Sequence, residues 1–312
     1  MATQPQLRLG TRGSPLALAQ AHETRRRLAL AHGWPEDAVE VVPIRTTGDL
    51  IQDRALSEAG GKGLFTKELD RALLDGAIDL AVHSAKDLPT VLAEGLHLAG
   101  ALPREDARDA LIAAGGGNLD TVPHGGAVGT ASLRRQAQLL RVRPDLRVRL
   151  LRGNVGSRLR RVEAGEFDAT LLAMAGLNRL GLAHHATAVL EEDDFLPAVG
   201  QGAIAITTRA GDGATASAVD PIIDADTTTA LTCERAYLAV LDGSCRTPIA
   251  GHATLEGDVL TFRGCVLSPD GRDAVSVRFT GVASAAAALG AAAAADLLAR
   301  GSAGLLSGFG PG

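Results

Sequence analysis

Residues 128–161 limit the possible folds of this chain more than any other stretch. They hold ten arginines and a single acid, Asp145, in a chain whose formal net charge is -5. Such dense positive charge must be balanced by acids elsewhere in the fold or by a bound anion. Because a guanidinium binds a carboxylate or phosphate through two hydrogen bonds, the arginines favour oxyanions. The stretch therefore predicts an anion site.

The small residues of this stretch predict its local structure. Residues 129–132 and 153–157 each have the composition of a tight turn between a strand and a helix. Such turns direct backbone N–H groups at an anion, and the helix dipole adds to the attraction. A third such turn occupies residues 11–15, where Ser14 is expected to cap a helix that stops at Gly33. Strands alternating with helices indicate an α/β fold.

The ten arginines differ in how strongly they suggest ligand binding. Four of them lie at or near the predicted turns and are the stronger candidates: Arg134, Arg135, Arg152 and Arg158. Four others are explained equally well as solvated helix faces: Arg141, Arg143, Arg160 and Arg161.

Composition excludes several classes of function. Aromatic residues make up 3% of the chain, which disfavours a nucleic-acid surface built on base stacking. The N-terminus lacks a basic segment followed by an apolar run, and no run of about 18 uncharged apolar residues occurs. We therefore expect a cytoplasmic protein with no membrane or nucleic-acid partner.

Three cysteines without a CxxC pair disfavour both a disulfide framework and a structural zinc site. Cys233 and Cys265 fall on a predicted helix and a predicted strand, so we expect buried thiols. Cys245 lies in a Gly-Ser loop beside Arg246, where a thiol is expected to be more acidic and more reactive. It is the preferred point for covalent attachment of a cofactor.

A second candidate site follows the predicted buried strand 78–82. Lys86 and Asp87 leave its carboxyl end, the edge of an α/β sheet where ligands bind. A carboxylate beside cations can hold positive charge that develops on a substrate, or move a proton. A hydrolase triad of His83, Ser84 and Asp87 is disfavoured, because the chain has no GxSxG motif.

Lys62 belongs to a glycine-rich segment that is not a Walker A motif, because Gly63 follows it where Ser or Thr is required. At the expected entrance of the helix 64–74 it is a candidate anion ligand.

Breaks in composition predict three domains. We expect residues 1–102 and 198–220 to form the first, 103–197 the second and 221–312 the third. Two crossings, near Pro103 and near 197–206, would join the first two domains through a hinge. The Gly- and Ala-rich residues 210–218 have the composition of a linker, and 46–59 that of a polar loop.

Eight ordered motifs together resemble one family. They are LRLGTRGSPLALAQA, GGKGLFTKEL, DLAVHSAKDLP, VGTASLRRQ, LRGNVGSRL, AGLNRLGL, LPAVGQGA and LDGSCRTPIAG. This set is similar to the porphobilinogen deaminases, also called hydroxymethylbilane synthases. The resemblance implies two periplasmic-binding-protein-like (type II) α/β domains with a hinged cleft, plus a small C-terminal α+β domain.

The resemblance also implies a transferase of tetrapyrrole and heme biosynthesis. Such enzymes join four porphobilinogen molecules head to tail, with loss of ammonia, and release hydroxymethylbilane. The chain would grow on a dipyrromethane cofactor held by a thioether, here at Cys245. A monomer without metal is expected. Because each pyrrole carries two carboxylates, the family's chemistry would account for the arginine surplus.

Carried over residue by residue, the family's motifs imply a role for each matching position. Asp87 would be the catalytic carboxylate. The cofactor would be bound by Cys245, Lys86, Asp87, Thr130, Ser132, Arg134, Arg135 and Gly156. The substrate would be bound by Arg12, Ser14, Lys62, Arg152, Arg158 and Arg179.

Two rival hypotheses come from other classes of protein. A non-catalytic, hinged anion-binding protein would need neither Asp87 nor an accessible Cys245. A nucleic-acid binder could use the arginine stretch, but the acidic net charge and the scarcity of aromatic residues disfavour it.

Overall fold

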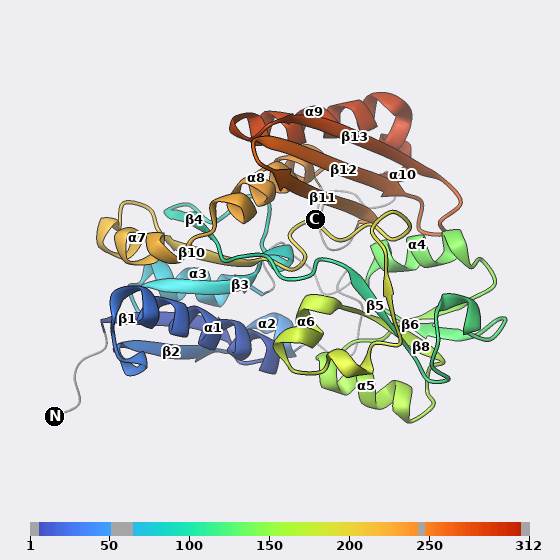
Figure 1. Cartoon of the computed structure of the whole chain (residues 1–312), viewed down its shortest axis with the longest axis horizontal. Helices are drawn as coiled ribbons and strands as arrows, with labels where there is room; N and C mark the ends of the chain where they lie inside the picture. Colours follow the sequence, from blue (N-terminus) through green and yellow to red (C-terminus); the bar gives the residue numbers. More distant parts are fainter. Residues whose placement is uncertain (1–5, 51–64, 243–246, 307–312) are drawn as a thin grey trace.

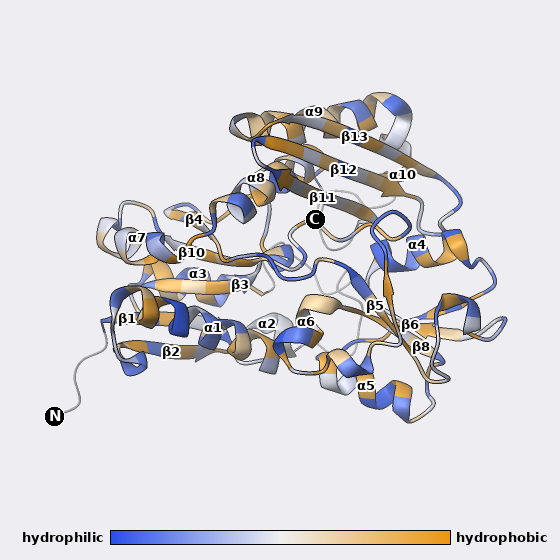
Figure 2. Cartoon of the chain, in the orientation of Figure 1, coloured by the Kyte–Doolittle hydropathy of each residue, from blue (hydrophilic) through white to orange (hydrophobic). Residues whose placement is uncertain are grey.

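The computed structural model describes residues 6–50, 65–242 and 247–306 of the 312-residue chain. Three sheets divide these residues, as Figure 1 shows: one at the left, one at the right and one at the top. Hydrophobic colour runs along strands β3 and β10 in Figure 2, whereas helix α5 is largely hydrophilic. The sheets supply the apolar cores, and several helices expose a polar face.

The first sheet has the strand order β2-β1-β3-β10-β4. Its strands are β1 (Leu7–Arg12), β2 (Val39–Ile44), β3 (Leu80–Ser84), β4 (Leu96–Ala101) and β10 (Ile204–Arg209). β1 pairs in parallel with β2 and β3, whereas β10 is antiparallel to β3 and β4. Helix α1 (Pro15–His32) packs on one face through Leu28, and helix α3 (Lys67–Leu74) on the other through Leu69 and Leu73.

The second sheet repeats this plan in the order β7-β6-β8-β5-β9. Its strands are β5 (Asp109–Ala113), β6 (Ala127–Gly129), β7 (Arg147–Arg149), β8 (Ala169–Ala173) and β9 (Ala188–Leu190). Helix α4 (Leu133–Val142) covers one face, and helices α5 (Val155–Glu163) and α6 (Met174–Arg179) cover the other. The fourth strand in each order, β10 in the first sheet and β5 in the second, runs antiparallel to its neighbours. Each of these strands directly follows a segment that crosses from one sheet to the other.

The third sheet is an antiparallel meander of β11 (Ile249–Glu256), β12 (Val259–Leu267) and β13 (Ala274–Val282). Helices α8 (Ala225–Val240) and α9 (Ala286–Leu297) pack on one face of it, where the rings of Tyr237 and Phe262 lie 4.7 Å apart. A Cβ at Gly290 would collide with the carbonyl oxygen of Cys233, so the glycine permits close packing of the two helices. The expected α/β class with a small α+β domain is confirmed.

Residues 283–306 are long and apolar enough, by length and composition alone, to cross a membrane. The segment is interrupted at Gly301, which has a φ of 91°. Within α9, the buried residues Ala293, Ala294 and Leu297 belong to the core of the third sheet. This packing accounts for the apolar face of the helix.

Several local predictions were wrong. Residues 210–218, expected as a linker, contribute to helix α7 (Gly213–Val219), which Asp212 caps and which buries Val219. The expected loop 46–59 begins with a short helix, α2 (Thr47–Leu50), and residues 51–59 lie outside the described part. Strand β11 had not been predicted. The Asp212 cap and the burial of Val219 stabilise α7, although its small residues favour a linker.

The two crossings between the first and second sheets meet beside the third domain. Arg104, on the first crossing, donates to both carboxylate oxygens of Glu234, at 2.6 and 3.1 Å. The same carboxylate accepts the backbone N–H of Gly200, on the return crossing, at 2.6 Å. Glu234 is fully buried. One carboxylate of α8 therefore holds both crossings.

Candidate active site

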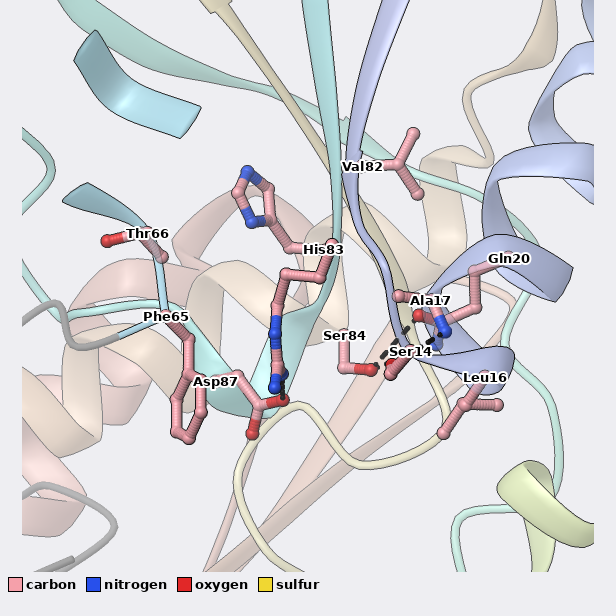
Figure 3. Close-up of a pocket in the computed structure, with 11 residues that line it drawn as sticks. Ser14, Leu16, Ala17, Gln20, Phe65, Thr66, Val82, His83, Ser84 and Asp87 are labelled. Carbon is pink, nitrogen blue, oxygen red and sulfur yellow. Dashed lines mark hydrogen bonds and ion pairs between the residues drawn. The ribbon is translucent and has the colours of Figure 1, made fainter. Parts of the chain in front are cut away.

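A pocket opens at the carboxyl ends of the neighbouring strands β1 and β3 (Figure 3). Its wall includes Arg12, Ser14, Gln20, His83, Ser84 and Asp87. Ligands of α/β sheets bind at this edge because the loops that leave parallel strands converge there. The predicted strand 78–82 is observed two residues later, so His83 and Ser84 belong to β3 itself.

Asp87 and Arg12 face each other in this pocket. Asp87 ends a single 3-10 turn, η2 (Ala85–Asp87), and its Oδ2 lies 3.7 Å from Nη1 of Arg12. The Arg12 guanidinium stacks over the ring of Phe65, 4.1 Å from its centroid. About 35% of the Asp87 side chain is exposed. The carboxylate can therefore reach a bound molecule.

The other members of a hydrolase triad are engaged elsewhere. Burial, with a smaller contribution from Arg12, lowers the pKa of His83 to about 4, and its Nε2 lies 3.0 Å from Oγ1 of Thr207. Ser84 and Gln20 exchange hydrogen bonds of 2.9 and 3.2 Å, drawn as dashes in Figure 3. A neutral histidine bonded to threonine does not activate this serine.

Three hydroxyl or amide side chains cap the helices that begin near the predicted anion turns. Ser14 accepts the N–H of Ala17 at the start of α1, and Ser132 accepts that of Arg135 at the start of α4. Asn154 caps α5 in the same way. Capping explains why these sequence positions hold Ser or Asn. Thr130 is buried, and its Oγ1 accepts the N–H of Ser132 at 3.1 Å.

Lys86 lies beside Asp87 and is partly buried. Its Nζ donates to Oε1 of Gln201, on the return crossing, at 3.2 Å. Burial, together with the charge of Arg135, lowers the pKa of Lys86 to about 8, although Asp87 opposes the change. Burial therefore disfavours the charged form of Lys86, and the two nearby carboxylates, Asp87 and Asp109, only partly offset it.

Arg134 and Arg135 bind a buried acid that was not predicted from the sequence. Oδ2 of Asp109 accepts from Arg134 at 2.7 Å, and Oδ1 accepts two bonds from Arg135, at 2.6 and 3.0 Å. All three side chains are buried. Burial alone would raise the pKa of Asp109, but the two guanidiniums hold it far below its usual range. This cluster compensates part of the arginine surplus.

Arg158 belongs to the same positive region. Burial, then the charges of Arg135 and Arg152, lowers its pKa to about 10, while Asp87 opposes them. Its Nε donates to the carbonyl oxygen of Gly153 at 2.8 Å. Cations from both domains therefore influence one another around Asp87. Mutual repulsion of this kind favours binding of an anion.

Arg179 is held between the domains. Its Nε lies 3.3 Å from Oε2 of Glu23, on α1, and its Nη2 donates to the carbonyl oxygen of Gly202 at 3.0 Å. The side chain is 8% exposed. These contacts hold α6 of the second sheet against α1 and the return crossing, whereas the substrate contact of Arg179 stays a prediction.

The remaining predicted residues differ in what can be said of them. Lys62 and Cys245 lie outside the described residues. Gly156 lies in the first turn of α5. A Cβ added there would lie 3.6 Å from its nearest neighbour, which is an ordinary contact, so packing alone does not require glycine at this position.

Cys233 is buried as expected, whereas Cys265 is partly exposed and the expectation of full burial was wrong. Burial raises the pKa of both thiols.

Sequence reasoning missed Asp109, Gln201 and Glu23. Asp109 had a weak signal, since it directly precedes the apolar run that forms β5. Gln201 also had a weak signal, because it is the one polar residue between two glycines in a predicted turn. Glu23 had none, because nothing in the sequence places α1 beside α6. Among the described residues, no group of three or more His, Cys, Asp or Glu side chains is arranged to hold a metal ion.

Comparison with known families identifies the site's relatives. Residues 7–217 match the model for porphobilinogen deaminase, dipyrromethane cofactor binding domain. The chain belongs to the porphobilinogen deaminase family. Residues 228–299 match the C-terminal domain of the porphobilinogen deaminases. The family match does not favour the rival hypothesis of a non-catalytic anion-binding protein.

Two curated porphobilinogen deaminases, from Nitrobacter winogradskyi and Nitrobacter hamburgensis, are each 57% identical over 289 residues. Each alignment covers 93% of this chain and 92% of the relative. Among solved structures, the arginine-specific periplasmic binding protein of Salmonella typhimurium is 10% identical with a TM-score of 0.40, covering 70% of this chain and 91% of that one. The strand orders of the three sheets define the fold.

Proposed function

We propose that this chain is a hydroxymethylbilane synthase. It joins four porphobilinogen molecules head to tail, with loss of ammonia, to make hydroxymethylbilane for tetrapyrrole biosynthesis. The single observation that carries the proposal is the group of cations around Asp87, where Arg12 lies 3.7 Å from the carboxylate. Lys86 and Arg158 belong to this group, and burial, followed by the charges of neighbouring guanidiniums, lowers the pKa of each. A substrate bearing two carboxylates per unit supplies the missing negative charge.

The residues present fit a dipyrromethane. The Nε of Arg134 is buried and has no hydrogen-bond partner within the described residues, so the protein leaves one cationic donor unsatisfied near the site. Acetate and propionate groups are the acceptors that guanidiniums prefer. The residues proposed to hold the cofactor are Lys86, Asp87, Thr130, Ser132, Arg134, Arg135 and Gly156. When bound, the dipyrromethane supplies the terminal pyrrole on which the product is built.

In this proposal Asp87 performs the chemistry. Positive charge develops on the substrate pyrrole as ammonia leaves, and the Asp87 carboxylate would stabilise that charge. Once the substrate's methylene carbon has bonded to the terminal pyrrole carbon of the growing chain, Asp87 would accept the proton that this terminal carbon loses. Arg12, 3.7 Å away, fixes the direction of the carboxylate. An electrostatic contact of this kind is worth roughly 3–4 kcal/mol of activation free energy. Ser14, Lys62, Arg152, Arg158 and Arg179 are proposed to bind substrate carboxylates together with Arg12.

Cys245 is proposed to carry the cofactor through a thioether. Support comes from the other two thiols: burial raises the pKa of Cys233 to about 12, and burial also raises that of Cys265. Because the thiolate is the reactive form, both are poor nucleophiles at neutral pH.

The intact mass of the purified protein tests this proposal. We expect extra mass equal to two linked pyrroles, lost in Cys245→Ser and retained in the control Cys265→Ser. An active enzyme without added mass would rule out covalent attachment. Hydroxymethylbilane formation from porphobilinogen tests the reaction separately.

Further proposals concern the location of the enzyme, its oligomeric state, its partners and its domain boundaries. We propose that the enzyme acts as a cytoplasmic monomer, with no membrane or nucleic-acid partner. The predicted boundaries, 1–102 with 198–220, 103–197, and 221–312, fall between the three sheets and are proposed as the domains. Sedimentation with and without porphobilinogen tests the monomer, and a dimer in both conditions would contradict it.

A further inference from the structure

Gln201 occupies the return crossing between two glycines, and the proposed reaction gives it no role. It is 1% exposed. Gly200 and Gly202 have φ values of 73° and 87°, and a Cβ at Gly202 would collide with the carbonyl oxygen of Glu105 on the other crossing. The two glycines therefore let the crossings approach closely and fix Gln201 between them.

The main chain of Gln201 is anchored on both sides. Its N–H donates to the carbonyl oxygen of Ala198 at 2.9 Å. Its own carbonyl oxygen accepts from Nε of Arg104 at 2.8 Å, and Arg104 is held by Glu234. Gln201 therefore has a fixed position relative to both crossings.

The orientation of the Gln201 amide follows from its neighbours. Nε2 lies 2.7 Å from the carbonyl oxygen of Ala107 and 3.0 Å from Oδ1 of Asp109. Both neighbours can only accept, so the nitrogen of the amide must face them. The amide oxygen then faces Nζ of Lys86, 3.2 Å away, and accepts from it.

We propose that Gln201 is a positioning residue that holds the Lys86 ammonium toward the active site and joins it to the buried cluster of Asp109, Arg134 and Arg135. The proposal rests on the proposed function, in which Lys86 binds a carboxylate. Four other charged groups act on Lys86: Asp87 from η2, Asp109 from β5, and Arg134 and Arg135 from α4. Gln201 links Lys86, which follows the first sheet's strand β3, to Asp109 on the second sheet's strand β5.

Lysine NMR tests this role without relying on turnover. The chain has three lysines, Lys62, Lys67 and Lys86, so holoenzyme labelled at lysine Cε gives three side-chain signals. The signal absent from Lys86→Arg identifies Lys86. Because the Gln201 oxygen stabilises the ammonium, Gln201→Leu should lower the titration midpoint by about one pH unit. Gln201→Glu should raise it, because a carboxylate replaces the amide oxygen.

Gln136→Leu is the matched control. Gln136 donates to the carbonyl oxygen of Pro269 in an exposed contact that does not involve Lys86, so its loss should leave the Lys86 midpoint unchanged. An unchanged midpoint in both Gln201 variants, or a shift in the same direction in both, would overturn the proposal. If Gln201→Leu does not fold, the direction of the shift in Gln201→Glu decides.

Activity supplies an independent measurement. Gln201→Leu should reduce kcat/KM about tenfold, the usual effect of losing a hydrogen bond to a charged group. The intact mass separates the two proposals: missing dipyrromethane in the wild type refutes the proposed function, whereas the lysine midpoints still report on Gln201. Normal kcat/KM in Gln201→Leu would contradict its role in catalysis.

Discussion

Nη2 of Arg134 lies 2.7 Å from Oδ2 of Asp109, and neither side chain is more than 5% exposed. The acid also binds Arg135, so one carboxylate faces two guanidiniums inside the protein. Part of the arginine surplus is therefore balanced by the fold itself. We propose that the cations around Asp87, Lys86 and Arg158 among them, are the part left to a ligand.

Asp109→Asn should destabilise the protein strongly. Two buried guanidiniums would lose their counterion, a loss that typically costs about 3–5 kcal/mol of the free energy of unfolding. Urea unfolding measures it. The matched control is Asp75→Asn, which breaks the exposed pair with Arg71 and should change stability by less than about 1 kcal/mol. Equal stability of the two variants would show that Asp109 is not the counterion.

Stability should fall in acid because of Glu234 and Asp109. Burial alone would raise the pKa of Glu234, but Arg104 and His252 hold it at about 2. A carboxylate with a lowered folded-state pKa stabilises the protein above its unfolded pKa of about 4.3, and that contribution is lost as the pH falls toward 2. In Glu234→Gln, the free energy of unfolding measured in urea should fall less between pH 5 and pH 2 than it does in the wild type. The same slope as in the wild type would contradict this assignment.

Asp87→Ala should abolish most turnover while the fold and the attached cofactor remain. Loss of one preorganised electrostatic contact lowers kcat by about 100- to 1000-fold. Circular dichroism and intact mass provide the controls for folding and loading. Asp87→Glu, which keeps the carboxylate, should retain more activity than Asp87→Ala. Turnover near the wild-type rate in Asp87→Ala would end the proposed role.

Cofactor loading of the apoprotein should weaken as the pH rises through about 8, which gives an alkaline limb. Burial, together with the charge of Arg135, lowers the pKa of Lys86 to about 8, so above this pH the apoprotein loses the ammonium proposed to bind the carboxylates of the cofactor. Intact mass of apoprotein incubated with porphobilinogen between pH 7 and pH 9 measures the loading. Lys86→Arg keeps its charge and should lose this alkaline limb. An unaltered limb in that variant would assign it to another group.

Glu23→Gln should loosen the contact between α1 and α6. Glu23 is the acid that faces Arg179 across the two domains, and both side chains are largely buried. We expect a loss of about 1–2 kcal/mol in the free energy of unfolding, with a smaller change in kcat. Glu36→Gln, which removes the more exposed partner of Arg25, is the control and should be nearly neutral. An effect no larger than the control would make the Arg179 contact incidental.

The sequence determined the local structures and the chemical character of the site. Ser14, Pro15 and Gly33 specify α1 because capping and left-handed φ depend on neighbours within one turn of the helix. Clustered arginines predicted an anion because charge surplus is additive along a chain. The position of Asp87 after a buried strand predicted its place at the sheet edge, for the same local reason.

The tertiary structure alone decided which charges are paired. Asp109 lies 25 residues from Arg134 in sequence, and Glu23 lies 156 residues from Arg179, so no local pattern could join them. The role of Gln201 likewise depends on two crossings that meet only in the folded chain. Helix α7 shows the same limit, since its composition indicated a linker. Local sequence sets what each segment can form, whereas burial against distant segments decides which charges meet their partners and which remain for a ligand.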